Sequence, residues 1–174
     1  PRKGDLYGNM MDKIHQTGGK YAGILWYQGC SDTDPEPAAQ YFQHFKEYVE
    51  AVRAELGYSI PVFTMQLNRQ INGIHDECWG MVRDAQRRAA LEIPDVYVLS
   101  TTNLSLSDGI HNSAPSNVAL GKKLAKQCAH VLAGGEEYEA PALCEVQRVT
   151  DQEKAELKLT GEWLKLTFDH VKGC

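Results

Sequence analysis

The residues best suited to acid–base chemistry lie in one short polar loop, where Asp108 and His111 stand three positions apart. At this spacing a carboxylate can reach one imidazole nitrogen and fix the tautomer of the ring, so that the other nitrogen can accept a proton. On composition alone, a structural role is the more frequent explanation for such a loop. Its place after a strand-like run at 96–100 favours the catalytic one, because α/β folds carry their chemistry at strand ends. We therefore interpret Asp108 and His111 as two parts of a catalytic triad.

A general base of this kind needs a nucleophile within hydrogen-bond reach. Several loops contain hydroxyl or thiol side chains, but none stands in a recognisable nucleophile turn such as Gly-x-Ser-x-Gly, and loop or capping roles explain each more simply. Nothing near the single thiol among them supplies an obvious cation, so an inert cysteine is favoured there. These candidates are Ser31, Thr101, Thr102, Ser105, Ser107, Ser113 and Cys30. We predict that the nucleophile lies outside this sequence.

A second candidate feature is the pair Gln28 and Gly29, which ends an apolar run at 21–27. A side-chain amide and a backbone N–H at the end of a strand can stabilise an oxyanion. A glutamine that hydrogen-bonds loop backbone explains the same residues equally well, so both interpretations stay open at this point. Tyr27 at the same strand end is expected in the core or in the wall of a cleft.

Three apolar runs of strand length alternate with stretches of helical periodicity, and this order predicts a parallel sheet with right-handed crossovers. A short helix at 6–16, which Asp5 can cap, precedes them. The unbroken apolar character of the first run predicts a strand covered on both faces. The expected strands are 21–27, 60–67 and 96–100, and the expected later helices are 38–56, 77–91 and 115–132.

From Ala140 onward the sequence changes character. Two runs that alternate with period two, 155–159 and 163–168, flank a Gly-Glu pair and predict a β-hairpin. A hairpin alone is marginally stable in water, so it must pack on other structure or begin a β-rich unit. We expect a partial α/β domain over 1–139 and a β-hairpin region over 140–174, the start of a C-terminal β domain.

The overall composition excludes several classes of protein. A net charge of -5 with scattered Lys and Arg disfavours a nucleic-acid partner. No apolar run approaches the roughly 18 residues that span a bilayer, so no membrane partner is expected. Five widely spaced cysteines without a Cys-x-x-Cys pair argue against a disulfide framework and favour a reducing compartment. His75, Asp76 and Cys78 lack a further ligand at metal-site spacing, so no metal and no cofactor is expected.

Six stretches, in order, resemble the sialate O-acetylesterase family of carbohydrate esterases, which are SGNH hydrolases. The two that make the resemblance specific are Gly-Ile-Leu-Trp-Tyr-Gln-Gly at 23–29 and Asp-Gly-Ile-His at 108–111. The others stand at 6–10, 82–88, 121–125 and 168–170.

The resemblance implies a three-layer α/β/α flavodoxin-like fold and hydrolysis of O-acetyl groups from sugars without a metal. It makes His111 the general base, Asp108 its orienting partner, and Gln28 and Gly29 part of the oxyanion region. Arg83 matches a recurrent arginine of the family to which we assign no role. An acetylated sugar is the implied substrate.

Two departures from the family pattern bear on activity. Nothing before Tyr21 resembles the Gly-Gln-Ser-Asn block that holds the family's nucleophile, so we expect a carboxyl-terminal part whose partner is a missing N-terminal segment of the same protein. Cys30 stands where the family commonly has Glu, and a thiol cannot accept hydrogen bonds as a carboxylate does. The alternatives are a carbohydrate-binding protein without catalysis and a thiol hydrolase that uses Cys30 with His111.

Overall fold

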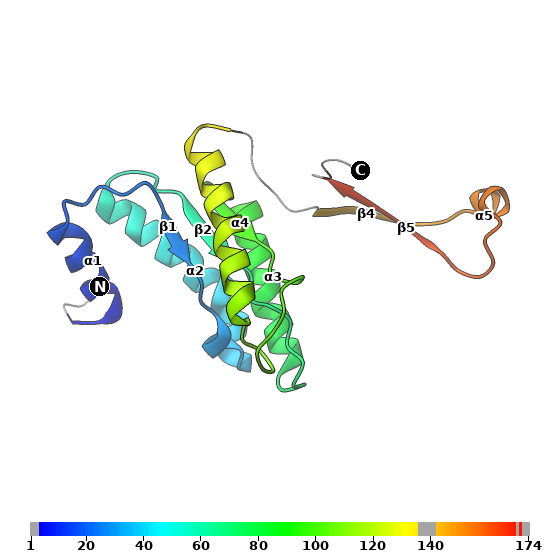
Figure 1. Ribbon diagram of the computed structural model, residues 1–174, viewed down its shortest axis with the longest axis horizontal. Coiled ribbons are helices and arrows are strands. Elements are labelled where there is room, and N and C mark those ends of the chain that lie inside the picture. Colours follow the sequence, from blue (N-terminus) through cyan, green and yellow to red (C-terminus); the bar gives the residue numbers. More distant parts are fainter. Residues whose placement is uncertain (1–3, 136–141, 170, 172–174) are drawn as a thin grey trace. The chain divides into compact units, whose positions relative to one another are not determined.

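The computed structural model describes residues 4–135, 142–169 and 171, and the chain divides into two compact units, Pro1–Glu136 and Glu137–Cys174 (Figure 1). None of the described helices is both long and apolar enough to cross a membrane.

The first unit is built on a parallel sheet with the strand order β1-β2-β3. These strands are Ile24–Trp26, Val62–Met65 and Val96–Leu99, and the central one is buried along its whole length. Phe63 pairs with Leu25 on one side and with Tyr97 on the other, so the three strands end at a common edge. The parallel α/β fold predicted from the alternation of apolar runs is confirmed.

Helices connect and flank the strands: α1 (Leu6–Gln16), α2 (Pro35–Leu56), α3 (Asp76–Glu92) and α4 (Ala114–Leu132), with a 3₁₀ turn η1 (Cys30–Asp32). Local signals define two of the helix ends, whereas α2 begins three residues before the expected position. The Asp5 carboxylate accepts the Gly8 N–H as the cap of α1, and Gly57 ends α2 in a left-handed conformation with φ 75°.

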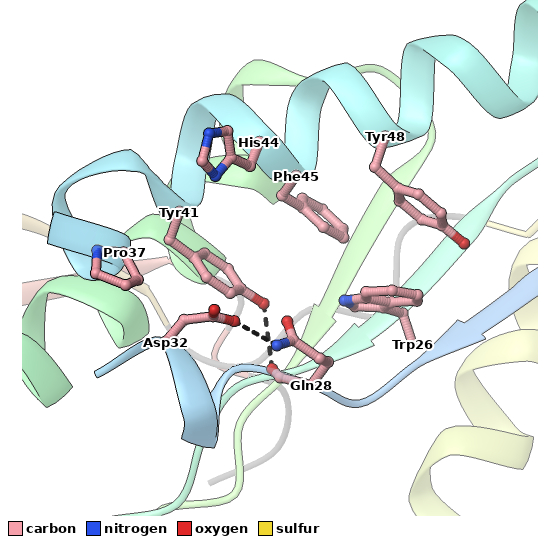
Figure 2. Close-up of a pocket in the computed structure, with 8 residues that line it drawn as sticks. All are labelled: Trp26, Gln28, Asp32, Pro37, Tyr41, His44, Phe45 and Tyr48. Carbon is pink, nitrogen blue, oxygen red and sulfur yellow. Dashed lines mark hydrogen bonds between the residues drawn. The ribbon is translucent and has the colours of Figure 1, made fainter. Parts of the chain in front are cut away.

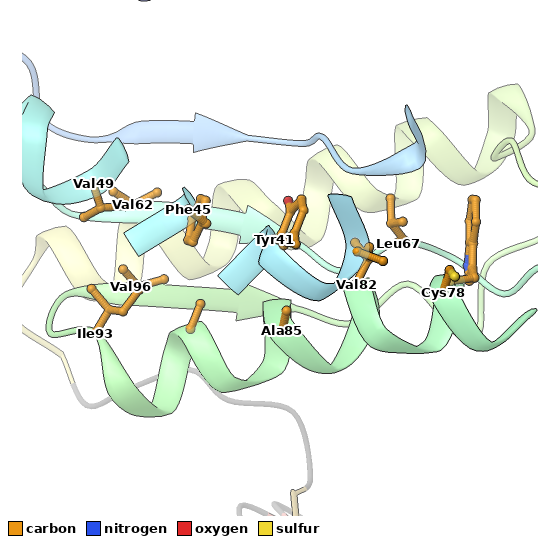
Figure 3. Packing of buried hydrophobic residues seen from close by; sticks show 13 residues of the cluster. Tyr41, Phe45, Val49, Val62, Leu67, Cys78, Val82, Ala85, Ile93 and Val96 are labelled. Carbon is orange, nitrogen blue, oxygen red and sulfur yellow. The ribbon is translucent and has the colours of Figure 1, made fainter. Parts of the chain in front are cut away.

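The helices form two layers around the sheet. Figure 3 shows α2 and α3 covering one face, where Phe45 and Val49 of α2 and Val82 of α3 pack against Val62 of the central strand. Side chains alternate across a strand, so Phe63 points to the opposite face. There it packs with Leu120 and Leu124 of α4 in a second cluster. The unit is therefore a three-layer α/β/α structure.

The expectation that the first strand is covered on both faces is wrong. Ile24 and Trp26 pack on the α2 and α3 side, but Leu25 is 62% exposed. The reason is the position of β1 at the side of the sheet: α4 packs over β2 and β3 and leaves Leu25 uncovered within the described residues. The regular strand is also shorter than the apolar run that predicted it.

The second unit is an antiparallel pair of strands, β4 (Ala142–Arg148) and β5 (Leu164–Asp169), joined through a short helix α5 (Asp151–Leu157). The strand expected at 163–168 is present, but the one expected at 155–159 is wrong. Thr150 and Glu153 form a capping box that starts a helix there, with each side chain bonding the other residue's backbone N–H. This local signal outweighs the period-two alternation.

Candidate active site

The centre of the candidate site is a hydrogen-bonded pair: Nδ1 of His111 lies 2.8 Å from Oδ2 of Asp108. The other oxygen, Oδ1, accepts the backbone N–H groups of Ile110 at 2.9 Å and His111 at 2.8 Å. These two backbone bonds, and then the imidazole, lower the pKa of Asp108 to about 2. An ionised carboxylate requires the proton of neutral His111 on Nδ1, which leaves the Nε2 lone pair free to act as a base.

The loop that carries this pair is closed on itself. Ser107 N donates to His111 O at 2.8 Å, and Leu106 and Asn112 form an isolated antiparallel bridge. Its tip is held against the loop after β2, since Ile71 N donates to Gly109 O at 3.0 Å. A Cβ added to Gly109 would lie 3.0 Å from that of Asn72, so a side chain here would push the two loops apart. The dyad is thus positioned by backbone contacts and not by its own packing.

Apart from Ser31, whose hydroxyl forms no hydrogen bond within the described residues, the hydroxyls considered as nucleophiles have structural partners. Ser105 bonds the hydroxyls of Ser113 and Ser116 at 2.7 and 2.8 Å, and Ser113 also caps α4. Thr101 donates to the carbonyl of Gln66 at 2.9 Å, and Ser107 donates to that of His111 at 3.3 Å. Thr102 accepts from Arg83 at 3.0 Å. Among the residues that the structure describes, no hydroxyl or thiol hydrogen-bonds Nε2 of His111.

A pocket of about 290 Å³ lies against His111. One wall is the loop after β1 and the other is the Asp108/His111 loop, which meet where the strands end. The lining residues are Tyr27, Gln28, Gly29, Cys30, Ser31, Leu67, Ile110, His111, Asn112 and Asn117. The fold therefore brings Gln28, Gly29 and His111, which are far apart in the sequence, into one pocket.

Gln28 and Gly29, the two residues assigned to the oxyanion region, differ in whether their N–H donors already have an acceptor. The Gln28 side-chain amide donates to Asp32, beside a second pocket of about 170 Å³ (Figure 2). Gly29 is buried, and its N–H donates to no acceptor in the described part of the chain. Its φ of 133° favours glycine, and an added Cβ would also lie 3.0 Å from Val82, which would have to shift. In this arrangement the Gly29 N–H is the better oxyanion donor of the two.

The thiol of Cys30 is half-buried in the pocket wall, and burial raises its pKa. A protonated thiol is a poor nucleophile at neutral pH, so the structure disfavours the thiol hydrolase alternative. Arg83 instead links elements: its side chain reaches Thr102 after β3, and its carbonyl accepts the Gln66 amide at 2.9 Å. Burial lowers the pKa of this guanidinium.

His75, Asp76 and Cys78, which were considered as metal ligands, form no metal site within the described residues. His75 precedes α3 and its Nε2 lies 3.7 Å from Oδ1 of Asp34. The residues that the structure describes contain no group of three or more His, Cys, Asp or Glu side chains arranged to hold a metal ion.

Two residues that sequence reasoning missed, Asn68 and Asn112, connect the pocket walls. Asn68 Nδ2 donates to Asn112 Oδ1 at 2.7 Å, and Asn112 Nδ2 donates to the Tyr27 hydroxyl at 2.9 Å. Their positions offered a signal, because Asn68 follows a strand and Asn112 follows His111. Their contact needed the tertiary structure.

Most of the chain is similar to known proteins. A family model described as "Carbohydrate esterase, sialic acid-specific acetylesterase" matches residues 1–130. A probable carbohydrate esterase from Arabidopsis thaliana is 29% identical over 131 residues, which is 72% of this chain and 48% of that protein. This chain thus spans about half the length of that curated relative.

Two solved structures are similar to the fold. The X-ray structure of the Arabidopsis thaliana protein has a TM-score of 0.62 and 27% identity, covering 74% of this chain and 53% of that one. A crystal structure of a carbohydrate acetylesterase from Xanthomonas citri has a TM-score of 0.70 over 82% of this chain and 33% of that one. At 24% identity the second likeness bears on the fold alone.

Proposed function

Because the chain belongs to the sialic acid-specific acetylesterase family of carbohydrate esterases, we propose that it supplies the His-Asp half of a serine esterase that removes acetyl groups from sugars, sialic acids among them. The observation that carries this proposal is the His111–Asp108 pair, held at 2.8 Å beside a pocket that Gly29 also lines. The fold accordingly corresponds to the SGNH, flavodoxin-like architecture.

In the proposed reaction, Nε2 of His111 takes the proton of a serine hydroxyl as its oxygen attacks the acetyl carbonyl. Asp108 stabilises the imidazolium, and the Gly29 N–H with the Gln28 loop stabilises the oxyanion. The tetrahedral intermediate collapses, and His111 returns its proton to the departing sugar oxygen. A water that His111 activates then attacks the acetyl-serine, releasing acetate and restoring the serine.

Two features support a nucleophile from outside the described residues. Apart from Ser31, which lines the pocket, the hydroxyls near the site bond to other partners, and no described hydroxyl bonds Nε2 of His111. In addition, β1 pairs only with β2 among the described strands, which leaves one edge open beside the pocket. A further parallel strand at this edge would end next to Gln28, where a serine could face His111.

A second candidate function is sugar binding without catalysis. Cys30 favours it, because a half-buried thiol with a raised pKa stands where the family commonly has a carboxylate. A protein of this kind would bind acetylated sugars without releasing acetate.

The test is hydrolysis of a chromogenic acetyl ester and of O-acetylated sialic acid by the longer protein that contains this chain. We expect activity that His111→Ala abolishes, that Cys30→Ala leaves in place, and that the 174-residue chain alone lacks. A folded longer protein that binds the acetylated sugar but releases no acetate would support the second candidate and exclude the first.

A further inference from the structure

We propose that the hydroxyl of Tyr27 donates a hydrogen bond to the substrate in the His111 pocket, and that Asn68 and Asn112 are positioning residues that direct its proton there. This inference rests on the proposed function, because the substrate is the acetylated sugar that His111 would act on. The supporting observations are the directions of the two hydrogen bonds that link Asn68 to Asn112 and Asn112 to Tyr27.

The direction is set at Asn68, whose side chain is almost fully buried at 1% exposure. Its Oδ1 accepts the Arg69 N–H at 2.8 Å, which identifies the other atom as the amide nitrogen. That nitrogen donates to Asn112 Oδ1 at 2.7 Å and to the Leu104 carbonyl at 3.3 Å. The Asn68 amide therefore cannot turn over without losing all three bonds.

The bond from Asn68 also fixes which atom of the Asn112 amide faces Tyr27. Because Asn112 Oδ1 already accepts from Asn68, its Nδ2 faces the phenol and donates to the Tyr27 oxygen at 2.9 Å. The Tyr27 hydroxyl thus accepts this bond and must use its own proton elsewhere. The described residues offer that proton no acceptor, and Tyr27 lines the pocket together with His111.

Two further observations agree with a donor role. Burial is the main cause that raises the pKa of Tyr27, so its hydroxyl keeps its proton at neutral pH. The neighbouring Gln28 amide donates to Asp32 on the side of the second pocket (Figure 2), whereas the Tyr27 proton has no acceptor among the described residues.

The hydrogen-bond chain is anchored in the core. Trp79 is 4% exposed, and its indole N–H donates to the Asn68 carbonyl at 2.7 Å. A bond that starts from a buried tryptophan of α3 therefore holds the residue that orients the Tyr27 proton. A preoriented donor costs little further ordering when the substrate binds.

The test compares Tyr27→Phe with Asn112→Asp in the longer protein, using kcat and KM for acetyl ester hydrolysis on the alkaline plateau of the pH profile. Tyr27→Phe removes one donor, and we expect kcat/KM to fall about tenfold. Asn112→Asp places an acceptor-only carboxylate against the phenol, which draws the proton away from the pocket. We expect the same loss for Asn112→Asp, and no further loss in the double variant, because both changes remove the same Tyr27–substrate hydrogen bond.

The control is Tyr7→Phe, which removes an exposed hydroxyl that reaches Glu55 at 3.3 Å and should leave kcat/KM unchanged. If His111→Ala abolishes activity but Tyr27→Phe behaves like this control, the Tyr27 inference is overturned and the esterase function stands. Losses that add in the double variant, with matching falls in melting temperature, would also overturn it by indicating a structural role. If the unmodified protein hydrolyses no acetyl ester, the proposed function fails, and the substrate contact fails with it.

Discussion

Replacing Asp108 with Asn should remove catalysis through a change in the tautomer of His111. Oδ1 of Asp108 accepts two backbone N–H groups at 2.9 and 2.8 Å. An asparagine must keep its oxygen at this place, because an NH₂ group there would face two other donors. Its nitrogen is then forced to the position of Oδ2, 2.8 Å from Nδ1 of His111.

An N–H donor at this position reverses the hydrogen bond. Nδ1 of His111 becomes the acceptor, the proton of the neutral ring moves to Nε2, and the base is lost. The equivalent change in the triad of serine proteases lowers kcat about 10⁴-fold. We expect a loss of about 10³-fold here, because both side chains are more than half exposed and water can compensate part of the effect.

Two measurements check this reasoning. The first is kcat for a chromogenic acetyl ester in the longer protein, with Asp84→Asn as the control, since Asp84 pairs with Arg87 at 2.8 Å on an exposed face of α3. The second is ¹⁵N NMR of the imidazole, which needs no activity and should show the proton on Nδ1 in the native protein and on Nε2 in Asp108→Asn. A variant that keeps its proton on Nδ1, or whose kcat stays within about tenfold of the native value, would refute the argument.

Further predictions concern pH and folding. The folded-state pKa of Asp108, about 2, lies below its ordinary value of 3.8. Its contribution to stability should therefore be complete above about pH 4 and disappear toward pH 2, and acid unfolding of Asp108→Asn should lack this step. Gly29→Ala should cost about 1–3 kcal/mol in urea unfolding, because φ is 133° there, whereas Gly80→Ala, with open space around it inside α3, should gain up to about 1 kcal/mol. Thr150→Ala should fray α5 by about 0.5–2 kcal/mol, seen as a loss of helical NMR shifts, and Thr160→Ala should not. Leu25→Lys should change the unfolding free energy of this 174-residue chain by less than about 0.5 kcal/mol, because Leu25 is exposed. If a further strand covers β1 in the longer protein, the same change should destabilise that protein more. Equal effects in both would count against such a strand.

Most of the fold could be predicted from the sequence because its signals are local. The bounds of α1 follow from Asp5 and the periodicity of one short stretch, and Gly57 marks the end of α2. The parallel sheet follows from the order of apolar runs. The capping box at Thr150 and Glu153 was an equally local signal, and reading it would have avoided the wrong strand at 155–159.

The sequence by itself determined which residues share a turn, a helix or a strand, and this includes the Asp108–His111 pair, whose spacing already permits the contact. Tertiary structure alone decided that Leu25 is exposed, that Gln28 and Gly29 share a pocket with His111, and that Asn112 donates to Tyr27, 85 positions away. The physical reason is how far apart along the chain the interacting residues lie. Caps and periodic faces depend on atoms within one or two turns of the chain, whereas the pocket depends on where loops from three strands meet, which no single segment specifies.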